Sequence, residues 1–300
     1  MHDCVIAGAG PSGCYAAQKL AEAGLKVLIL EEHAEAGRPV HCTGIVGEKL
    51  IVDFLVDPAC IKQSISSVKV NFPSGATLSL PTPIRPFIID RAHFDKFLAR
   101  RAIESGAQLR YGSQVKKITE INNRTEIIFE NNGVPEKVEA KLCIIATGAM
   151  SSLPYSHGIS KPEIAYRTVQ ADVEMKDIDG IELFLGRNLA PGSFAYAVSS
   201  DESGAKIGLL SRTDTKIHFN SLLSLPQVKD RIVNLTGEPR FRVMPFGIPQ
   251  KTVNGRIIAV GDAACQLKTT TGGGIYYLSL IHISEPTRLL SISYAVFCLK

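Results

Sequence analysis

Three glycines near the amino terminus have the spacing of a turn that binds a pyrophosphate. Gly8, Gly10 and Gly13 form the pattern Gly-x-Gly-x-x-Gly, in which the glycines permit a tight bend, let the backbone approach the phosphates and let the next helix pack on the preceding strand. The helix amino terminus carries partial positive charge and faces the pyrophosphate. Glu31 follows about 20 residues later, where a carboxylate accepts ribose hydroxyls and disfavours a 2′-phosphate. These residues predict a site for FAD or NAD rather than NADP.

The elements that must position this turn form one predicted βαβ unit over residues 1–31. An apolar strand precedes the glycines, an alanine-rich helix follows them and stops at Gly24, and a second apolar strand ends on Glu31. A glycine pattern alone is a weak signal, whereas this strand, turn and helix context is what the site requires. The alternative, a glycine-rich turn without a ligand, is therefore disfavoured.

The sequence after residue 31 predicts further helices and strands. A helix is expected to begin at Asp90 and to stop near Gly106, and residues 163–249 change in character to several strands. The expected segments are short strands at 108–111, 115–118 and 125–129, a buried strand at 142–146, strands near 168–175, 194–198 and 206–210, one helix-like region near 228–235, and a strand at 256–260.

Composition excludes several classes of protein. The chain has 300 residues, of which 45% are hydrophobic and 21% charged, as in a folded α/β protein. The net charge of +4 comes from scattered basic residues, so we expect no nucleic-acid partner. Seven cysteines without a CxxC pair argue against a disulfide framework and a metal site, and favour the cytoplasm. There is no room for a signal peptide and no apolar run of about 18 residues, so any membrane contact would be peripheral.

Four separated motifs together resemble the FAD-dependent oxidoreductases of the para-hydroxybenzoate hydroxylase type. They are Gly8–Gly13, the pattern Asp90-Arg91-x-x-Phe94-Asp95, Ala146-Thr147-Gly148 and Gly261-Asp262-Ala263-Ala264. Within that group, Arg38–Gly44 and the run from Gly261 to Tyr277, which contains Thr270-Thr271-Gly272-Gly273-Gly274-Ile275, resemble the geranylgeranyl reductase family. The resemblance extends from residue 1 to about residue 277.

This resemblance implies a fold and a division into domains. The fold is α/β, with a Rossmann-like FAD-binding domain into which a mainly antiparallel-sheet substrate domain is inserted. The predicted FAD-binding domain comprises residues 1–66, 84–162 and 250–277, and the predicted substrate domain comprises residues 67–83 and 163–249.

The resemblance also implies that the cofactor is FAD and assigns residues to it. Glu31 would hold the adenosine ribose, Arg91 would lie near the phosphates and ribityl chain, and Asp262 would accept a ribityl or ribose hydroxyl. From the residues alone, a helix N-cap is the alternative interpretation of Asp262, and an ordinary exposed arginine is the alternative interpretation of Arg91. The remaining predicted FAD-binding residues are Gly8, Gly10, Pro11, Ser12, Gly13, Arg38, Val115, Gly148, Gly261, and Gly272, Gly273, Gly274 and Ile275, which would begin a helix that faces the flavin pyrimidine.

The implied reaction is reduction of isolated carbon-carbon double bonds in a polyprenyl lipid by hydride transfer from reduced flavin. Cys42 is the predicted catalytic residue, because the resemblance places it against the flavin, although free cysteines are often inert core residues. An isolated alkene carries no charge, so an apolar groove should bind it. Phe194 and Tyr196 occupy the place of the family's groove-lining aromatics, but the chain has no Trp, and Ser199 replaces a common proline. Ordinary sheet-core aromatics are the alternative for both.

Two other functions of the same fold remain open. One is a flavin monooxygenase that acts on an aromatic or polyketide-like molecule, and the other is a flavoprotein that passes electrons to a quinone. The chain has no second Gly-x-Gly-x-x-Gly turn, so both ferredoxin and NAD(P)H remain candidate electron donors. A lipid substrate would bring a cytoplasmic enzyme to the membrane surface as a peripheral protein.

The last segment differs from the rest of the chain. Residues 278–300 begin with Leu-Ser-Leu-Ile-His-Ile-Ser-Glu-Pro-Thr-Arg, which resembles the translation of a sequencing-library adapter. We therefore expect a non-native tail on a C-terminally truncated chain and exclude it from the fold. The alternative is a natural, divergent C-terminal helix.

Overall fold

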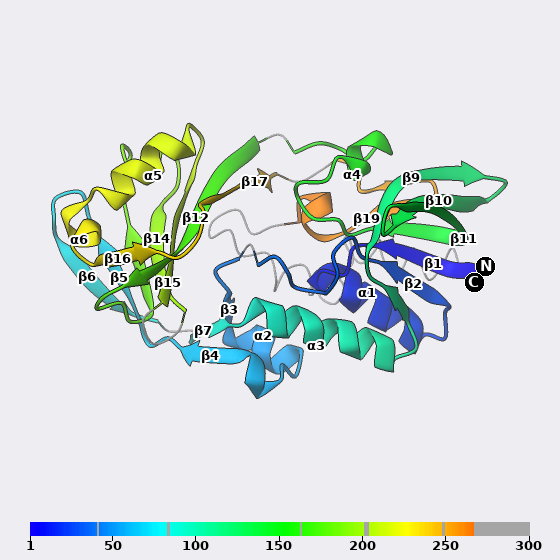
Figure 1. The fold of residues 1–300 in the computed structure, drawn as a ribbon, viewed down its shortest axis with the longest axis horizontal. Helices are drawn as coiled ribbons and strands as arrows, with labels where there is room; N and C mark the ends of the chain where they lie inside the picture. The colour runs from blue at the N-terminus through cyan, green and yellow to red at the C-terminus, as the bar shows by residue number, and fades with distance from the viewer. Residues whose placement is uncertain (41, 83–84, 163, 201–203, 248–249, 267–300) are drawn as a thin grey trace. The chain divides into compact units, whose positions relative to one another are not determined.

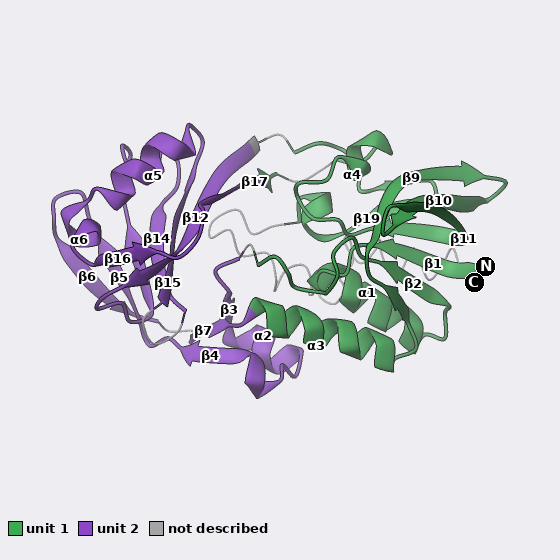
Figure 2. Cartoon of the chain, viewed as in Figure 1, with its two compact units in different colours: residues 1–40, 91–164, 245–300 green, residues 41–90, 165–244 purple. Residues whose placement is uncertain are grey.

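The computed structural model describes residues 1–40, 42–82, 85–162, 164–200, 204–247 and 250–266. The chain forms two compact units, with residues 1–40, 91–164 and 245–300 in unit 1 and residues 41–90 and 165–244 in unit 2 (Figure 2). The predicted tail and the predicted residues Gly272, Gly273, Gly274 and Ile275 lie outside the described residues.

Unit 1 is built on an eight-stranded sheet, in which six strands have the order β18-β19-β11-β1-β2-β8. Figure 1 labels β19, β11, β1 and β2 of these strands. These strands are β18 (Val253–Asn254), β19 (Ile257–Ala259), β11 (Val134–Ile145), β1 (His2–Ala7), β2 (Val27–Leu30) and β8 (Gln108–Arg110). β1 is parallel to both β2 and β11, and β11 is parallel to β19. The chain order therefore reverses beside β1, which is where ligands bind in open α/β sheets.

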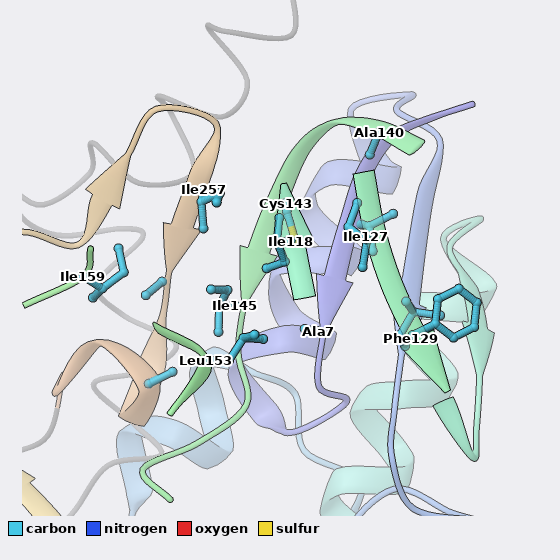
Figure 3. Packing of buried hydrophobic residues seen from close by; sticks show 14 of the residues in the cluster. Ala7, Ile118, Ile127, Phe129, Ala140, Cys143, Ile145, Leu153, Ile159 and Ile257 are labelled. Atoms are coloured by element: carbon cyan, nitrogen blue, oxygen red, sulfur yellow. The ribbon is translucent and has the colours of Figure 1, made fainter. Parts of the chain in front are cut away.

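Helices and a hairpin complete unit 1. Helix α1 (Pro11–Glu22) packs against β2 and against helix α3 (Arg91–Glu104). The antiparallel strands β9 (Ser113–Ile121) and β10 (Arg124–Asn131) extend the sheet from β11, and the short helices are α4 (Leu153–Ser156) and the 3-10 turn η2 (Gly261–Ala264). The core joins these parts, because Ile118, Ile127 and Phe129 of the hairpin belong to one buried cluster with Ile145 and Ile257 of the parallel strands (Figure 3). The predicted βαβ unit and the predicted helix after Asp90 are both present.

Unit 2 contains a second, mainly antiparallel sheet with the order β16-β12-β15-β14-β13-β5-β6, to which β17 is added beside β12. Its strands are β16 (Ile232–Leu235), β12 (Ile164–Met175), β15 (Gly204–Ser211), β14 (Ala195–Ser199), β13 (Ile181–Phe184), β5 (Ser67–Asn71), β6 (Thr77–Pro81) and β17 (Arg240–Phe246). Helices α5 (Thr215–Leu223) and α6 (Pro226–Lys229) contribute to the core on one face, where Phe219 and Leu222 pack with Val169, Ile207 and Leu209.

The opposite face of this sheet carries polar side chains. Gln170 and Asp172 alternate with the buried Val169 and Ala171 along β12, and Lys206 alternates with Ile207 along β15. Because successive residues of a strand point to opposite faces, these polar groups lie on the face away from the α5 and α6 core.

A small sheet completes unit 2 and differs from the predicted division. It has the order β3-β7-β4, from β3 (Ile45–Gly47), β7 (Pro86–Ile89) and β4 (Ile61–Ser64), and α2 (Glu48–Asp53) and the 3-10 turn η1 (Pro58–Cys60) lie between its strands in the sequence. The sequence placed residues 41–66 and 84–90 in the FAD-binding domain. In the structure they group with unit 2, and β3, β4 and β7 pair with one another rather than with the parallel sheet.

One predicted element is wrong. The helix-like region near 228–235 ends at Lys229, and residues 232–235 form strand β16, which pairs with β12. The apolar residues of this short segment fit both the period of a helix and that of a strand. The pairing with β12 favours the strand. Among the described residues, no helix is both long and apolar enough to cross a membrane.

Candidate FAD site and the Cys42 loop

The predicted cofactor residues meet at one edge of the unit 1 sheet. Gly8 directly follows β1, Glu31 follows β2, and Gly261 follows β19 after a single residue, while Gly148 comes three residues after β11. Parallel strands present their carboxyl ends at the same edge. Four segments far apart in the sequence therefore converge beside the point where the strand order reverses.

The glycine turn is tight on one side and open on the other. Gly8 has a φ of +106°, and a Cβ there would lie 2.5 Å from the carbonyl oxygen of Ala146. A Cβ on Gly13 would lie 2.0 Å from the oxygen of Gly8, so neither position tolerates a side chain without backbone movement. A Cβ on Gly10 would meet no atom of the described residues within 4 Å. Gly10 is the N-cap of α1 with no side-chain cap, so the helix amino terminus is open to an anion.

Glu31 joins the end of β2 to the glycine turn. Its Oε2 accepts a hydrogen bond of 2.7 Å from the Ala9 N–H, and its Oε1 accepts one of 3.0 Å from the His33 N–H and lies 2.6 Å from His33 Nδ1. The side chain is 10% exposed. A carboxylate has about four acceptor positions, so lone pairs remain for ribose hydroxyls.

Arg91 and Asp262 form the second half of the candidate site. Arg91 is 15% exposed and makes two hydrogen bonds of 2.9 Å to the Asp95 carboxylate, so it is not an ordinary exposed arginine. Asp262 lies in the first turn of η2, whose N-cap is Val260, so the N-cap interpretation is wrong. Burial raises the pKa of Asp262 to about 6, while the positive charge of Arg91 acts in the opposite direction. The two side chains therefore lie close enough to interact.

These residues fit an FAD molecule by their chemistry. Asp262 Oδ1 and Thr147 Oγ1 are buried and have no hydrogen-bond partner among the described residues. A buried acceptor without a partner is costly, and a ribityl hydroxyl would satisfy it. The open space over Gly10 and the free helix terminus suit a pyrophosphate. The candidate site therefore has one end whose chemistry suits an anion and one end whose chemistry suits hydroxyl groups.

The other predicted cofactor residues have varied surroundings. Pro11 is the first residue of α1 and Ser12 is buried within it. Arg38 is largely exposed and forms an ion pair of 3.0 Å with Glu35. Val115 lies in β9 and packs against the unit 1 core. These positions show no feature that by itself points to FAD.

Cys42 lies in unit 2, in a loop that holds its sulfur. The Gly44 N–H donates to Cys42 Sγ at 3.4 Å, and Lys206 Nζ donates to the Cys42 carbonyl oxygen at 3.3 Å. Gly44 has a φ of +84°, and a Cβ there would lie 2.4 Å from the Ile89 oxygen. Cys42 is half-buried, whereas the other five cysteines within the described ranges are buried.

Tyr196 lies on the same polar face as Lys206. The register places Tyr196 opposite Gly208 of β15 and Gly208 opposite Gln170 of β12. The tyrosine hydroxyl donates to Gln170 Oε1 at 3.1 Å, and its ring passes so close to Gly208 that a Cβ there would lie 2.7 Å from the hydroxyl oxygen. Burial raises the pKa of Tyr196, and the nearby Cys42 adds to the increase. The ring of Phe194 is 6.4 Å from that of Tyr196.

Three residues that contact Cys42 or Tyr196 were not predicted from the sequence, namely Lys206, Gln170 and Gly208. The sequence does show polar residues at alternate positions of otherwise apolar strands. This pattern does not show which strands are neighbours, and these residues meet only because of the register of β12, β15 and β14.

Comparison with known proteins agrees with this architecture. The profile of the pyridine nucleotide-disulphide oxidoreductase family matches residues 2–179. The fold is similar to that of a geranylgeranyl bacteriochlorophyll reductase-like protein from Thermoplasma acidophilum, with a TM-score of 0.85, 22% identity, and coverage of 99% of this chain and 79% of that one. It is also similar to the p-nitrophenol 4-monooxygenase of Pseudomonas putida, with a TM-score of 0.76, 16% identity, and coverage of 98% and 81%. The fold and the site define an FAD-dependent oxidoreductase.

The family follows from sequence similarity. Digeranylgeranylglycerophospholipid reductase 1 of Methanothermobacter thermautotrophicus is 30% identical over 299 residues, which cover 91% of this chain and 73% of the relative. The chain belongs to the geranylgeranyl reductase family.

Proposed function

We propose that the protein saturates isolated carbon-carbon double bonds in the polyprenyl chains of a geranylgeranyl lipid. The name of the 30% identical relative supports this substrate class. When bound and reduced, FAD supplies a hydride to one alkene carbon and is thereby oxidised. A proton must reach the other carbon, so that each double bond gains two hydrogens.

The observation that carries the proposal is the environment of Cys42. Its sulfur accepts a backbone hydrogen bond from Gly44, and an ammonium group lies at its carbonyl. Both contacts hold the loop that carries the thiol, one at its sulfur and one at its carbonyl oxygen. Cys42 would deliver the proton, and Phe194 and Tyr196 would contact the apolar chain and exclude water. Electrons would come from ferredoxin or NAD(P)H, and contact with the lipid surface would be peripheral.

An anaerobic assay tests this proposal. FAD-loaded protein, reduced chemically and mixed with a geranylgeranyl lipid in vesicles, should yield products that have gained two hydrogens per double bond by mass spectrometry. Cys42→Ala should lose most of this activity, while Cys60→Ala, which alters a buried cysteine of the same unit, serves as the matched control.

The same assay separates the alternative functions. The first alternative is a flavin monooxygenase, since the fold is similar to that of a monooxygenase. A hydroxylated product formed only in the presence of oxygen would support this alternative. Reduction of an added quinone with no change to the lipid would support electron transfer. Full alkene reduction by Cys42→Ala would remove the thiol from the mechanism.

A further inference from the structure

Lys206 is a lysine in an unusual position, within β15 between two other strands of the unit 2 sheet. It lies on the polar face, and its Nζ donates to the carbonyl oxygen of Cys42 at 3.3 Å. Burial lowers the pKa of Lys206, and negative charge on Cys42 acts in the opposite direction. Placing an ammonium group in a sheet costs free energy, so a hydrophobic residue would serve the fold better.

The charged groups around Lys206 do not neutralise it. Asp172 of β12 is opposite Lys206 in the register, but its carboxylate accepts from Arg240 of β17. Lys62 and Asp90 also interact electrostatically with Lys206, and they are paired with each other at 3.5 Å. Tyr196 donates its hydroxyl to Gln170. Within the described part of the chain, Lys206 has no ion pair with a carboxylate, and its hydrogen bond leads to Cys42.

We propose that Lys206 is the positioning residue of Cys42, holding the Cys42 loop by its carbonyl and stabilising and reprotonating the thiolate that remains after the thiol has delivered its proton. The loop contact keeps Cys42 Sγ beside the Gly44 N–H. This inference deepens the proposed function and rests on it for the proton-delivery step.

The proton balance of this cycle is complete. The Cys42 S–H bond breaks as a C–H bond forms on the substrate, which leaves a thiolate. Lys206 then transfers one ammonium proton to the sulfur and becomes a neutral amine, which water reprotonates. Burial brings the acidity of the ammonium closer to that of a thiol, which makes this transfer easier. An arginine keeps its proton, so it could supply the charge but not the transfer.

The first experiment measures alkylation of Cys42 and needs no substrate. The FAD-loaded full chain is treated with iodoacetamide over a range of pH, and the Cys42 peptide is quantified by mass spectrometry. Removing a positive charge near a thiol lowers the fraction present as thiolate, which is the form that is alkylated. Lys206→Met should therefore slow alkylation about tenfold near neutral pH, and the difference should disappear at high pH, where the thiol is ionised in both proteins.

Three further variants separate charge from structure. Lys206→Arg should alkylate at close to the wild-type rate because it keeps the charge. Lys206→Gln can still donate to the Cys42 carbonyl but is neutral, so its Cys42 should alkylate as slowly as that of Lys206→Met. Lys206→Gln also serves as the neutral variant if Lys206→Met does not fold. Lys69→Met removes a lysine that pairs with Glu182 at 3.5 Å on the other face of the sheet and should change nothing. Wild-type alkylation in the two neutral variants, or slowing that is equal at every pH, would overturn the proposal.

The second experiment distinguishes this inference from the proposed function. In anaerobic assays, the first turnover of Lys206→Arg should proceed at close to the wild-type rate, because its thiol is already protonated. A defect should appear in repeated turnovers, in which the thiolate must be reprotonated. If the wild type itself reduces no alkene, the proposed function fails while the alkylation result still decides whether Lys206 controls the thiol. Normal repeated turnover by Lys206→Arg would overturn the reprotonation step.

Discussion

Gly10 and Gly13 belong to the same turn but have different surroundings, and this difference gives a test of the FAD site. A Cβ on Gly13 would overlap the Gly8 oxygen at 2.0 Å, whereas one on Gly10 would enter open space. Gly13→Ala should lower the free energy of unfolding of the FAD-free protein by about 2–3 kcal/mol. Gly10→Ala should change it by less than about 1 kcal/mol, yet weaken FAD binding by about tenfold or more because the methyl group occupies the place of the phosphates.

Urea unfolding and FAD fluorescence titration measure these two effects separately. Gly10→Ala serves as the folding control for Gly13→Ala, since both add one methyl group to the same turn. Normal FAD affinity in Gly10→Ala would show that the space over Gly10 is not the pyrophosphate site.

Asp262 gives a prediction about pH. Burial raises the pKa of Asp262 from 3.8 to about 6, so the folded protein favours the neutral acid. Its contribution to stability is therefore complete below pH 3.8 and is lost as the pH rises through about 6. Asp262→Asn stays neutral, so the FAD-free variant should exceed the wild type in stability above pH 6, by at most about 3 kcal/mol, and match it near pH 4.

Thermal unfolding of both proteins across this pH range measures the difference. The neighbouring Arg91 opposes the increase, so in Arg91→Met the pH dependence should move to higher pH. A constant difference between wild type and Asp262→Asn at every pH would contradict the assignment of the titration to Asp262.

At the scale of elements, strand register determines how Tyr196 is held. Its hydroxyl crosses Gly208 to reach Gln170, whose Nε2 is buried and has no partner among the described residues. Tyr196→Phe leaves both polar atoms of the Gln170 amide unpaired, which should cost about 1–3 kcal/mol of stability. In Tyr196→Phe with Gln170→Leu the loss should be smaller than the sum of the single losses, as measured by urea unfolding. Additive losses would mean that the hydrogen bond contributes nothing.

The secondary structure shows which elements a sequence can specify. β1, α1 and β2 were predictable because the strand, turn and helix signals agree over 1–31. Helix α5 was missed, although Asp214 accepts from the Lys216 N–H at its start and Phe219 and Leu222 share a buried face. Strand β16 was predicted as helix because four residues are too few to show a period. Short elements take their conformation from the neighbour that they pair with.

At the scale of the whole molecule, the candidate FAD site and the surroundings of Cys42 differ in how much of each could be predicted from the sequence. The candidate cofactor residues Glu31, Arg91 and Asp262 could be proposed from the sequence because each lies in a local motif beside a strand or helix end. The interaction of Arg91 with Asp262 joins segments far apart in the sequence. The contacts of Lys206 with Cys42 and of Gln170 with Tyr196 likewise depend on which distant segments are neighbours. Local patterns contain no information on that pairing.

The division into units leads to a prediction about which segments of the chain bind each part of the cofactor. Adenosine diphosphate carries the ribose and pyrophosphate of FAD, which the Gly8–Gly13 turn and Glu31 of unit 1 are predicted to bind. In hydrogen–deuterium exchange it should protect amides of residues 9–14 and 31–33, because ligand binding stabilises the segments that hold the ligand. FAD should extend protection to 147–148 and 261–262, where the buried Thr147 and Asp262 oxygens would gain hydroxyl partners. Adenosine diphosphate should leave exchange in β12, β14 and β15 unchanged, and at the same concentration it should protect Gly10→Ala less than the wild type. Protection of those three strands by adenosine diphosphate would show that unit 2 takes part in binding the adenosine half, and would overturn the assignment of that half to unit 1 alone.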